Sequence, residues 1–275
     1  YREAAAERVW QWLRQWRRSL KNYPYLFPQH EAFFTDYLAG QDRQCVQAHA
    51  VLLFDSPDKA AGVKQTLMGD QLAHLLARDD HQELLMEASY FIPGDAFVAE
   101  LAEMKQRGGR AAVLTNSLAT NDVIAAHGAY ARYRDGLLEA GVELHELAPN
   151  ARALHRQVRL FKGRSRASLH TKAMVLDRRE VFVGSFNIDP RSVHLNTEMG
   201  YYVASAELGQ QVAAFIEEGL APENSYRVDK EQGKLTWAGD GHDGRPLVLH
   251  NEPGVTVWRR MLAWLLSLLP IERML

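Results

Sequence analysis

Apolar residues recur along the chain with two different periods. A spacing of three and four residues predicts helices, whereas short apolar runs bounded by glycine, proline or asparagine predict strands. In the N-terminal part, this pattern predicts helices over residues 2–20, 30–38 and 59–76 and one strand over residues 47–54. We therefore expect the beginning of the chain to be mainly helical.

From residue 84 onward, strands and helices alternate regularly. Asp95 is expected to cap one helix, and Gly108–Gly109 to end it. The other expected helices span 122–139, 208–220 and 257–269, and the expected strands span 84–91, 111–114, 142–147, 169–176, 181–184 and 198–203, with three short ones after residue 221. This alternation predicts an α/β fold.

Composition and charge narrow the choice of partner. The residues are 47% hydrophobic and 24% charged, as in an ordinary globular protein, and the formal net charge is −2. A chain with this balance has no overall positive field that points to nucleic acid, which is disfavoured as a partner, although nine Lys or Arg residues between Ala151 and Arg179 would suit an anionic ligand. No apolar run reaches the roughly 20 residues that cross a bilayer, so no transmembrane segment is expected.

The residues with the strongest chemical signal lie on the expected strand 169–176. Side chains alternate between the two faces of a strand, so His170 and Lys172 are expected on one face. Burying a lysine there is costly unless it holds an anion. A neutral imidazole can attack phosphorus, a protonated one can donate to a leaving oxygen, and the ammonium can stabilise the phosphate charge.

A second group of polar residues follows this strand. Ser185 and Asn187 offer uncharged hydrogen bonds suited to phosphate oxygens, and Gly184 would let the backbone approach a ligand. Glu198, on the next expected strand, is a carboxylate that can orient His170 through its second ring nitrogen. The alternative is a solvated strand face, because isolated His-x-Lys pairs are common by chance.

The complete spacing argues against chance. It reads HxK, four residues, D, six residues, GSxN, and it comprises His170, Lys172, Asp177, Gly184, Ser185 and Asn187. This pattern resembles the HKD motif of the phospholipase D superfamily. Residues 90–95, 114–122 and 186–198 further resemble the second half of bacterial cardiolipin synthases, and residues 264–272 resemble the tail of the C type.

The resemblance implies a fold and a domain organisation. It implies a mixed sheet flanked by helices, a phospholipase D-like lobe that forms the second half of a bilobal enzyme. Residues 1–79 would be the helical remainder of the first lobe and a linker, 80–220 the catalytic lobe, and 221–275 a C-terminal extension with a terminal amphipathic helix. The likeness is specific over 80–275 and weaker before that.

The resemblance also implies a mechanism without a metal or other cofactor. One histidine would form a phosphohistidine, and the other, here His170, would act as general acid and base. Lys172, Ser185 and Asn187 would hold the phosphate, Glu198 would orient His170, and Asp177 and Gly184 would be structural. Substrates would be phospholipids, with the enzyme peripheral on the bacterial cytoplasmic membrane.

The chain departs from the family in having a single motif, because no other histidine is followed by lysine two residues later. The second half-site would come from a first-half lobe of a longer native chain, which we favour because the chain starts at Tyr1 inside a predicted helix, or from a second copy in a homodimer. The chain alone is expected to be nearly inactive.

Two features of the sequence have both a functional and a purely structural interpretation. Asn116 and Ser117 follow a predicted strand, where they would line the site or cap a loop. The terminal helix, with Trp258, Trp264 and Arg259, would lie in the headgroup zone of a membrane or, as we favour, dock on the core.

The leading function is phosphatidyl transfer that makes cardiolipin. A phospholipase D or nuclease-type hydrolase would use the same motif, and a non-catalytic lobe that completes a partner's site is a third possibility.

Overall fold

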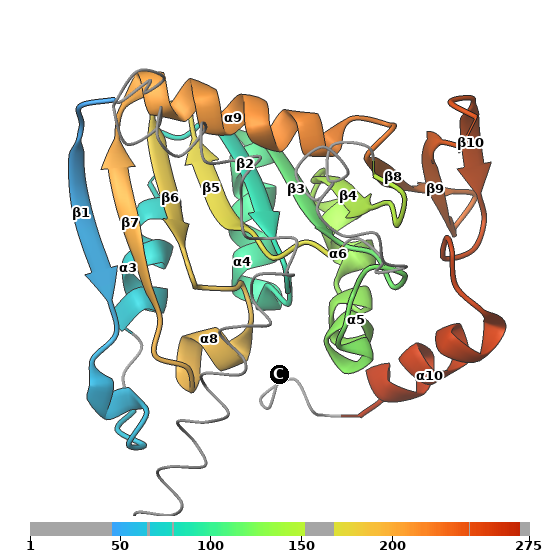
Figure 1. Cartoon of the computed structure of the whole chain (residues 1–275), viewed down its shortest axis with the longest axis horizontal. Coiled ribbons are helices and arrows are strands. Elements are labelled where there is room, and N and C mark those ends of the chain that lie inside the picture. Colours follow the sequence, from blue (N-terminus) through green and yellow to red (C-terminus); the bar gives the residue numbers. More distant parts are fainter. Residues whose placement is uncertain (1–45, 65–66, 79, 152–167, 242, 270–275) are drawn as a thin grey trace, which may run out of the picture. The chain divides into compact units, whose positions relative to one another are not determined.

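The computed structural model describes residues 46–64, 67–78, 80–151, 168–241 and 243–269, and from residue 47 on these belong to one compact unit. The helices predicted over residues 2–20 and 30–38 lie outside the described residues. The strands join in a ten-stranded sheet with the order β1-β7-β6-β5-β2-β3-β4-β8-β9-β10 (Figure 1). Among the described strands only the pairs β2–β3 and β3–β4 are parallel, which confirms the expected mixed sheet flanked by helices.

The elements have the following bounds. The strands are β1 His49–Phe54, β2 Glu83–Ala88, β3 Arg110–Asn116, β4 Glu143–Leu147, β5 Lys172–Leu176, β6 Glu180–Gly184, β7 Met199–Ala204, β8 Ser225–Glu231, β9 Lys234–Asp240 and β10 Pro246–Leu249. The helices are η2 Pro57–Lys59, α3 Leu67–Leu76, α4 Gly94–Gln106, α5 Ile124–Ala131, α6 Arg134–Glu139, α8 Pro190–His194, α9 Ala206–Leu220 and α10 Val257–Ser267.

The central strands are buried on both faces. Leu85 of β2 packs in the cluster that includes Ile216 of α9, whereas its neighbour Met86 packs with Met68 of α3 and Leu101 of α4. Figure 1 shows α9 running across one face of the sheet. Strands covered on both faces carry nearly continuous apolar runs, which explains why β2 does not show the alternation of a half-exposed strand.

Several predicted element bounds were wrong. The helix expected over 59–76 begins only at Leu67, because Gly62 has a φ of 91° and ends the short η2 turn before it. The helix expected over 122–139 is split into α5 and α6. Asp95 is not the cap of α4, since the helix already begins at Gly94, and its carboxylate instead lies in the first turn.

The expected division at residues 80 and 221 does not divide the sheet. Strand β1, from before residue 80, pairs with β7, and β8, from after residue 221, pairs with β4. Because these ladders run through both boundaries, the described residues on either side fold as parts of one sheet.

Candidate active site

The neighbouring strands β7, β6, β5 and β2 bring motif residues together at one end of the strands. Lys172, the first residue of β5, lies opposite Ala88 at the end of β2. On the other side, Gly184 at the end of β6 pairs with Gly200 of β7, and the Ser185 amide donates to the Met199 carbonyl at 2.8 Å. The register therefore gathers Lys172 and Ser185, with Glu198 just before β7, although they are distant in sequence.

His170 lies in a loop immediately before β5, which corrects the expectation that it is a strand residue. Asn116 holds this loop through the backbone of Leu169: its Oδ1 accepts from the amide at 2.9 Å, and its Nδ2 donates to the carbonyl at 3.0 Å. Ser89 donates to the Thr171 carbonyl at 3.1 Å. The backbone on both sides of His170 is thus anchored, while His170 itself is exposed.

Lys172 is a half-buried ammonium without a carboxylate partner among the described residues. Its Nζ donates to Ser89 Oγ at 3.0 Å and to the His170 carbonyl at 2.9 Å, which leaves one of three protons unused. Burial lowers the pKa of Lys172, and the carboxylates of Glu198, Asp189 and Asp122 oppose this shift. An anion bound at Nζ would offset the cost of that burial.

Glu198 is buried and accepts hydrogen bonds from two serine side chains, those of Ser185 and Ser192. Its carboxylate accepts from Ser185 Oγ and, at 3.1 Å, from Ser192 Oγ. No hydrogen bond joins it to His170, although both residues are described, so its role in orienting the imidazole stays a prediction. The bond to Ser185 fixes a hydroxyl that was predicted to contact phosphate.

A buried ion pair that the sequence did not reveal supports Glu198. Asp55 accepts from Lys59 Nζ at 2.6 Å, and both side chains are fully buried. The same carboxylate accepts from the Glu198 amide at 3.1 Å, and Lys59 Nζ also donates to the Ser192 carbonyl at 2.9 Å. The pair thus holds the backbone at Glu198 and Ser192. An Asp and a Lys four residues apart carry no distinctive signal in sequence.

Asn187 borders a small cavity beside the motif. Its side chain is buried, and Oδ1 has no hydrogen-bond partner among the described residues. The cavity measures about 260 Å³ and is also lined by Tyr90, Asp189 and Arg191. Tyr90 donates to Asp122 at 2.8 Å. An unpartnered buried acceptor at a cavity is suited to a ligand that carries a hydrogen-bond donor, such as a hydroxyl group.

Asp177 and Gly184 have structural surroundings. Asp177 Oδ1 accepts from the amides of Gln82 and Glu83 at 2.8 and 2.9 Å, and Oδ2 bonds to His81 at 2.8 Å. Burial alone would raise the pKa of Asp177, but these hydrogen bonds outweigh it and lower the pKa. A Cβ on Gly184 would lie 2.4 Å from the Met199 carbonyl oxygen, so the glycine admits strand β7 rather than a ligand.

The two residues after β3 have different roles. Asn116 positions the histidine loop, as described above. Ser117 is fully buried and organises the following turn, where its hydroxyl contacts that of Thr120 at 3.2 Å and its carbonyl accepts from the amides of Thr120 and Asn121. Both side chains are buried and hold backbone, Asn116 that of Leu169 and Ser117 that of the following turn, so a role of either residue in lining the site stays a prediction.

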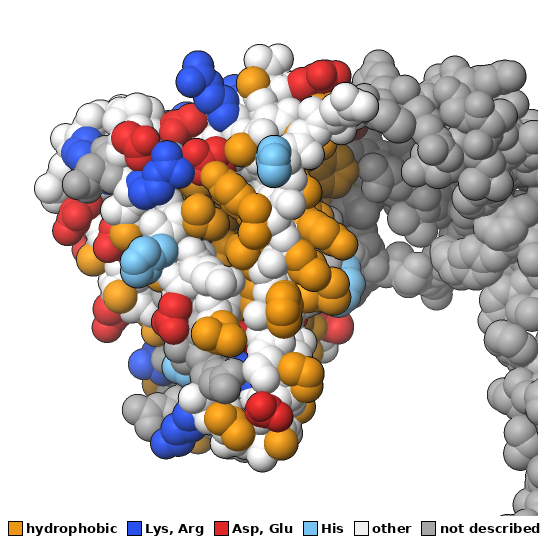
Figure 2. All heavy atoms as spheres, turned by 90° about the vertical axis from the view of Figure 1, so that its left-hand side faces the viewer, with side chains coloured by type: hydrophobic (Ala, Val, Ile, Leu, Met, Phe, Trp, Pro, Cys, Tyr) orange, Lys and Arg blue, Asp and Glu red, His pale blue; other side chains and the backbone are white. Residues whose placement is uncertain are grey.

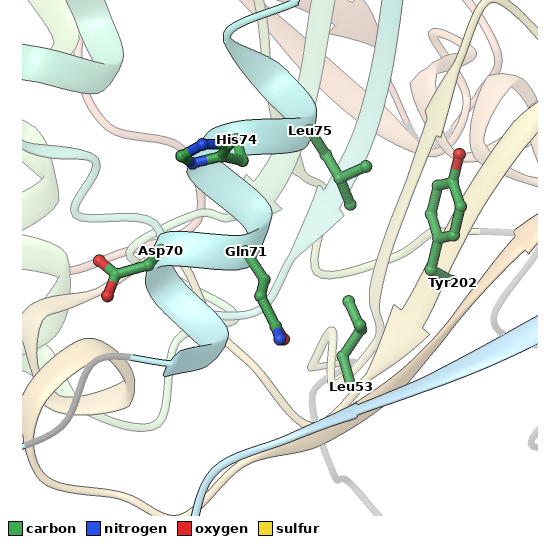
Figure 3. A pocket seen from close by; sticks show the side chains of 6 residues that line it. All are labelled: Leu53, Asp70, Gln71, His74, Leu75 and Tyr202. Atoms are coloured by element: carbon green, nitrogen blue, oxygen red, sulfur yellow. The ribbon is translucent and has the colours of Figure 1, made fainter.

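Another hollow of the described structure lies away from the motif. It measures about 460 Å³ and lies between α3 and the strands β1 and β7 (Figure 3). Leu53, Leu75 and Tyr202 face the gap, whereas Asp70 and His74 project from the opposite side of α3. With an apolar lining and no motif residue, it offers no phosphodiester chemistry.

The fold and the motif define a phospholipase D-like lobe, and comparison with known families makes this specific. Residues 76–219 match the family model described as "Cardiolipin synthase, PLD-like domain". The match covers more than half of the chain, and the chain belongs to this family.

Curated relatives agree with this membership. Cardiolipin synthase C of Escherichia coli K12 is 36% identical over 266 residues, which cover 94% of this chain and 55% of the relative. Cardiolipin synthase A of Pectobacterium carotovorum is 26% identical over 156 residues, which cover 57% of this chain and 28% of the relative. The chain thus spans about half of the first relative and less of the second.

Solved structures with a similar arrangement include two bacterial proteins. Nuc of Salmonella typhimurium, a phospholipase D family member, is 17% identical with a TM-score of 0.44, covering 66% of this chain and 99% of that protein. Phosphatidylserine synthase of Haemophilus influenzae is 14% identical with a TM-score of 0.44, covering 64% of this chain and 39% of that protein.

Proposed function

We propose that the chain supplies one of two half-sites for phosphatidyl transfer between phospholipids, with cardiolipin as the product. The observation that carries this proposal is a half-buried Lys172 that has no carboxylate partner among the described residues and whose Nζ donates to the backbone carbonyl of the exposed His170. Ser185 follows β6 at the same end of the strands. Membership in the cardiolipin synthase family supports the choice of substrate.

The proposed reaction has two displacements at phosphorus. The histidine of the other half attacks the donor phosphate, and His170 protonates the departing alcohol oxygen, which leaves a phosphohistidine. His170 then removes the proton of the acceptor hydroxyl as that oxygen attacks phosphorus and releases the first histidine. Lys172 would stabilise the phosphate oxygens throughout, with Asn187 donating from Nδ2 and Ser185 from an Oγ that leaves Glu198.

An uncovered part of the sheet supports a second lobe as partner. Cross-strand neighbours share a face, which places Leu52, Tyr201 and Val183 in one row and Phe54 and Met199 in the next. These five side chains are exposed, and Figure 2 shows apolar side chains gathered on the side of the molecule at β1. A contiguous apolar face beside Ser185 fits a first-half lobe or a second copy.

The proposed location is the surface of the bacterial cytoplasmic membrane. None of the described helices is both long and apolar enough to span a bilayer. A peripheral position is proposed because phospholipid substrates reside there.

A hydrolase remains the alternative within the same chemistry. With water in place of the acceptor alcohol, the protein would be a phospholipase D or a nuclease. A further alternative is a non-catalytic lobe that completes a partner's site, and in that case His170 would not be needed for turnover. The cardiolipin synthase relatives favour the lipid acceptor.

The test is turnover of labelled phosphatidylglycerol by the protein together with its first-half lobe. His170→Ala should abolish cardiolipin formation, and the exposed His250→Ala should not. The chain without a second half should be nearly inactive. Robust activity of His170→Ala at normal abundance would reject the proposal, and release of free phosphatidic acid alone would assign a hydrolase.

A further inference from the structure

Helix α10 turns its apolar side away from the protein. Trp258 is 71% exposed, Trp264 60% and Leu268 63%. Successive helical residues are rotated by about 100°, so these three side chains share one side of the helix. The same side also carries exposed Val257, Met261 and Leu265. We call this set the outer face of α10.

The opposite side of α10 is fixed to the body of the protein. Ala263 is buried against α5, where a Cβ on Gly128 would lie 2.8 Å from the Ala263 carbonyl oxygen. The Arg259 guanidinium donates to the carbonyls of Leu118 and Asn121 at 3.1 and 2.7 Å. These contacts set the rotation of the helix, so the exposure of the outer face is part of the folded structure.

The segment that leads into α10 is anchored as well. Glu252 accepts from the buried Arg134 at 2.7 Å and contacts His127 at 3.1 Å. Arg134 and His127 hold the pKa of Glu252 well below its usual range against the effect of burial. Thr256 then caps the helix through the Arg259 amide. A helix docked at both its entry and its inner side presents a stable surface.

This surface is linked to the proposed active site. Arg259 holds the loop that follows β3, and that loop begins after Asn116, whose side chain anchors the backbone beside His170. In Figure 1, α10 and α5 lie at the same end of the sheet as α8, which follows the Ser185 loop. The outer face of α10 therefore belongs to a helix at the same end of the sheet as the motif.

We propose that the outer face of α10 lies flat in a phospholipid membrane, at the boundary between headgroups and acyl chains. The composition of the helix favours lipid over protein: two tryptophans flank the face, α10 carries no acidic residue, and Arg260 adds a positive charge beside the docked Arg259. Tryptophan and arginine suit the interfacial zone of anionic bilayers. The choice of lipid rests on the proposed function, since phospholipid is the proposed substrate.

The test uses the full chain and vesicles of phosphatidylglycerol and phosphatidylcholine. Trp258→Ser combined with Trp264→Ser should lower vesicle partitioning about tenfold or more, because the two largest of the six apolar side chains of the face are lost. The matched control, Leu247→Ser with Val248→Ser, removes exposed apolar side chains from β10 and should leave partitioning unchanged. His170→Ala should bind vesicles like the wild type, which separates this proposal from the catalytic one.

A second measurement does not depend on the folding of a variant. Phospholipids brominated on their acyl chains should quench the tryptophan fluorescence of the wild-type protein on binding. Vesicle binding without quenching, or equal binding by the double tryptophan variant, overturns the proposal. Loss of association with a first-half lobe or a second copy, with vesicle binding unchanged, would overturn it in favour of a protein partner.

Discussion

Asn116 holds both backbone polar groups of Leu169 with the two ends of one carboxamide, at 2.9 and 3.0 Å. The same Nδ2 also donates to the Ser89 carbonyl at 3.0 Å, which ties the loop to the end of β2. His170 follows Leu169 directly, so a buried side chain on β3 determines where the exposed imidazole sits.

Replacement of Asn116 should disturb this position. Asn116→Ala leaves the buried amide and carbonyl of Leu169 without partners, which costs about 1–3 kcal/mol for each group. We expect a lower free energy of unfolding and a larger fall in kcat than in KM for the complete enzyme. Urea unfolding and steady-state kinetics measure the two effects. Unchanged kcat in a protein of reduced stability would show that the loop does not need this anchor for catalysis.

The Asp55–Lys59 pair should behave as a buried salt bridge. Removing one member leaves a buried charge unpaired, so Asp55→Ala or Lys59→Met should each cost roughly 3–5 kcal/mol of unfolding free energy. The double variant should cost less than the sum of the two, because no lone charge remains. Chemical denaturation of the four proteins checks this, and strict additivity would contradict it.

Glu87 should make stability depend on pH. It is buried on β2, and a Cβ on Gly219 of α9 would lie 2.9 Å from its Oε1. Burial raises the pKa of Glu87 from 4.5 to about 7, although a hydrogen bond from Thr171 opposes the shift. Between these values the folded protein binds more protons than the unfolded chain, so its stability falls as pH rises and stays reduced above pH 7.

Glu87→Gln should remove this dependence. Relative to wild type, the variant should gain up to about 3 kcal/mol of stability at pH 8 and little at pH 4.5, as the shift of the pKa implies. Urea unfolding across this range measures the difference. The exposed Glu231→Gln is the control, and a variant whose pH profile runs parallel to that of the wild type would refute the assignment.

Lys172 should be required for protection by oxyanions. Tungstate or phosphate bound at its Nζ would stabilise the folded state in proportion to occupancy, and hence raise Tm. We expect Lys172→Met to lose this increase while its Tm without ligand stays equal or rises, because a half-buried ammonium has been removed. Thermal unfolding of both proteins with and without oxyanion measures this effect. An equal increase in the Tm of the variant would show that the anion binds elsewhere.

Local chemistry and spacing were enough to predict the motif and the alternation of strands and helices, whereas a structural role for Asp177 was implied only by the resemblance to the family. These depend on the order of residues along short segments. The sequence also indicated that residues 257–269 form an apolar helix. It did not show which side of that helix faces the protein, because this depends on Gly128 and on carbonyls after β3 that are distant in the chain.

The tertiary structure decided how the site is held together. His170 lies in a loop and not in a strand. Glu198 accepts hydrogen bonds from Ser185 and Ser192, and the buried Asp55–Lys59 pair holds the backbone of Glu198 and Ser192. The bonds of Glu198 to Ser185 and Asp55 join segments that the strand register brings together. A sequence specifies which groups must be satisfied when buried, but the partner of each group is chosen by the packing of the whole sheet.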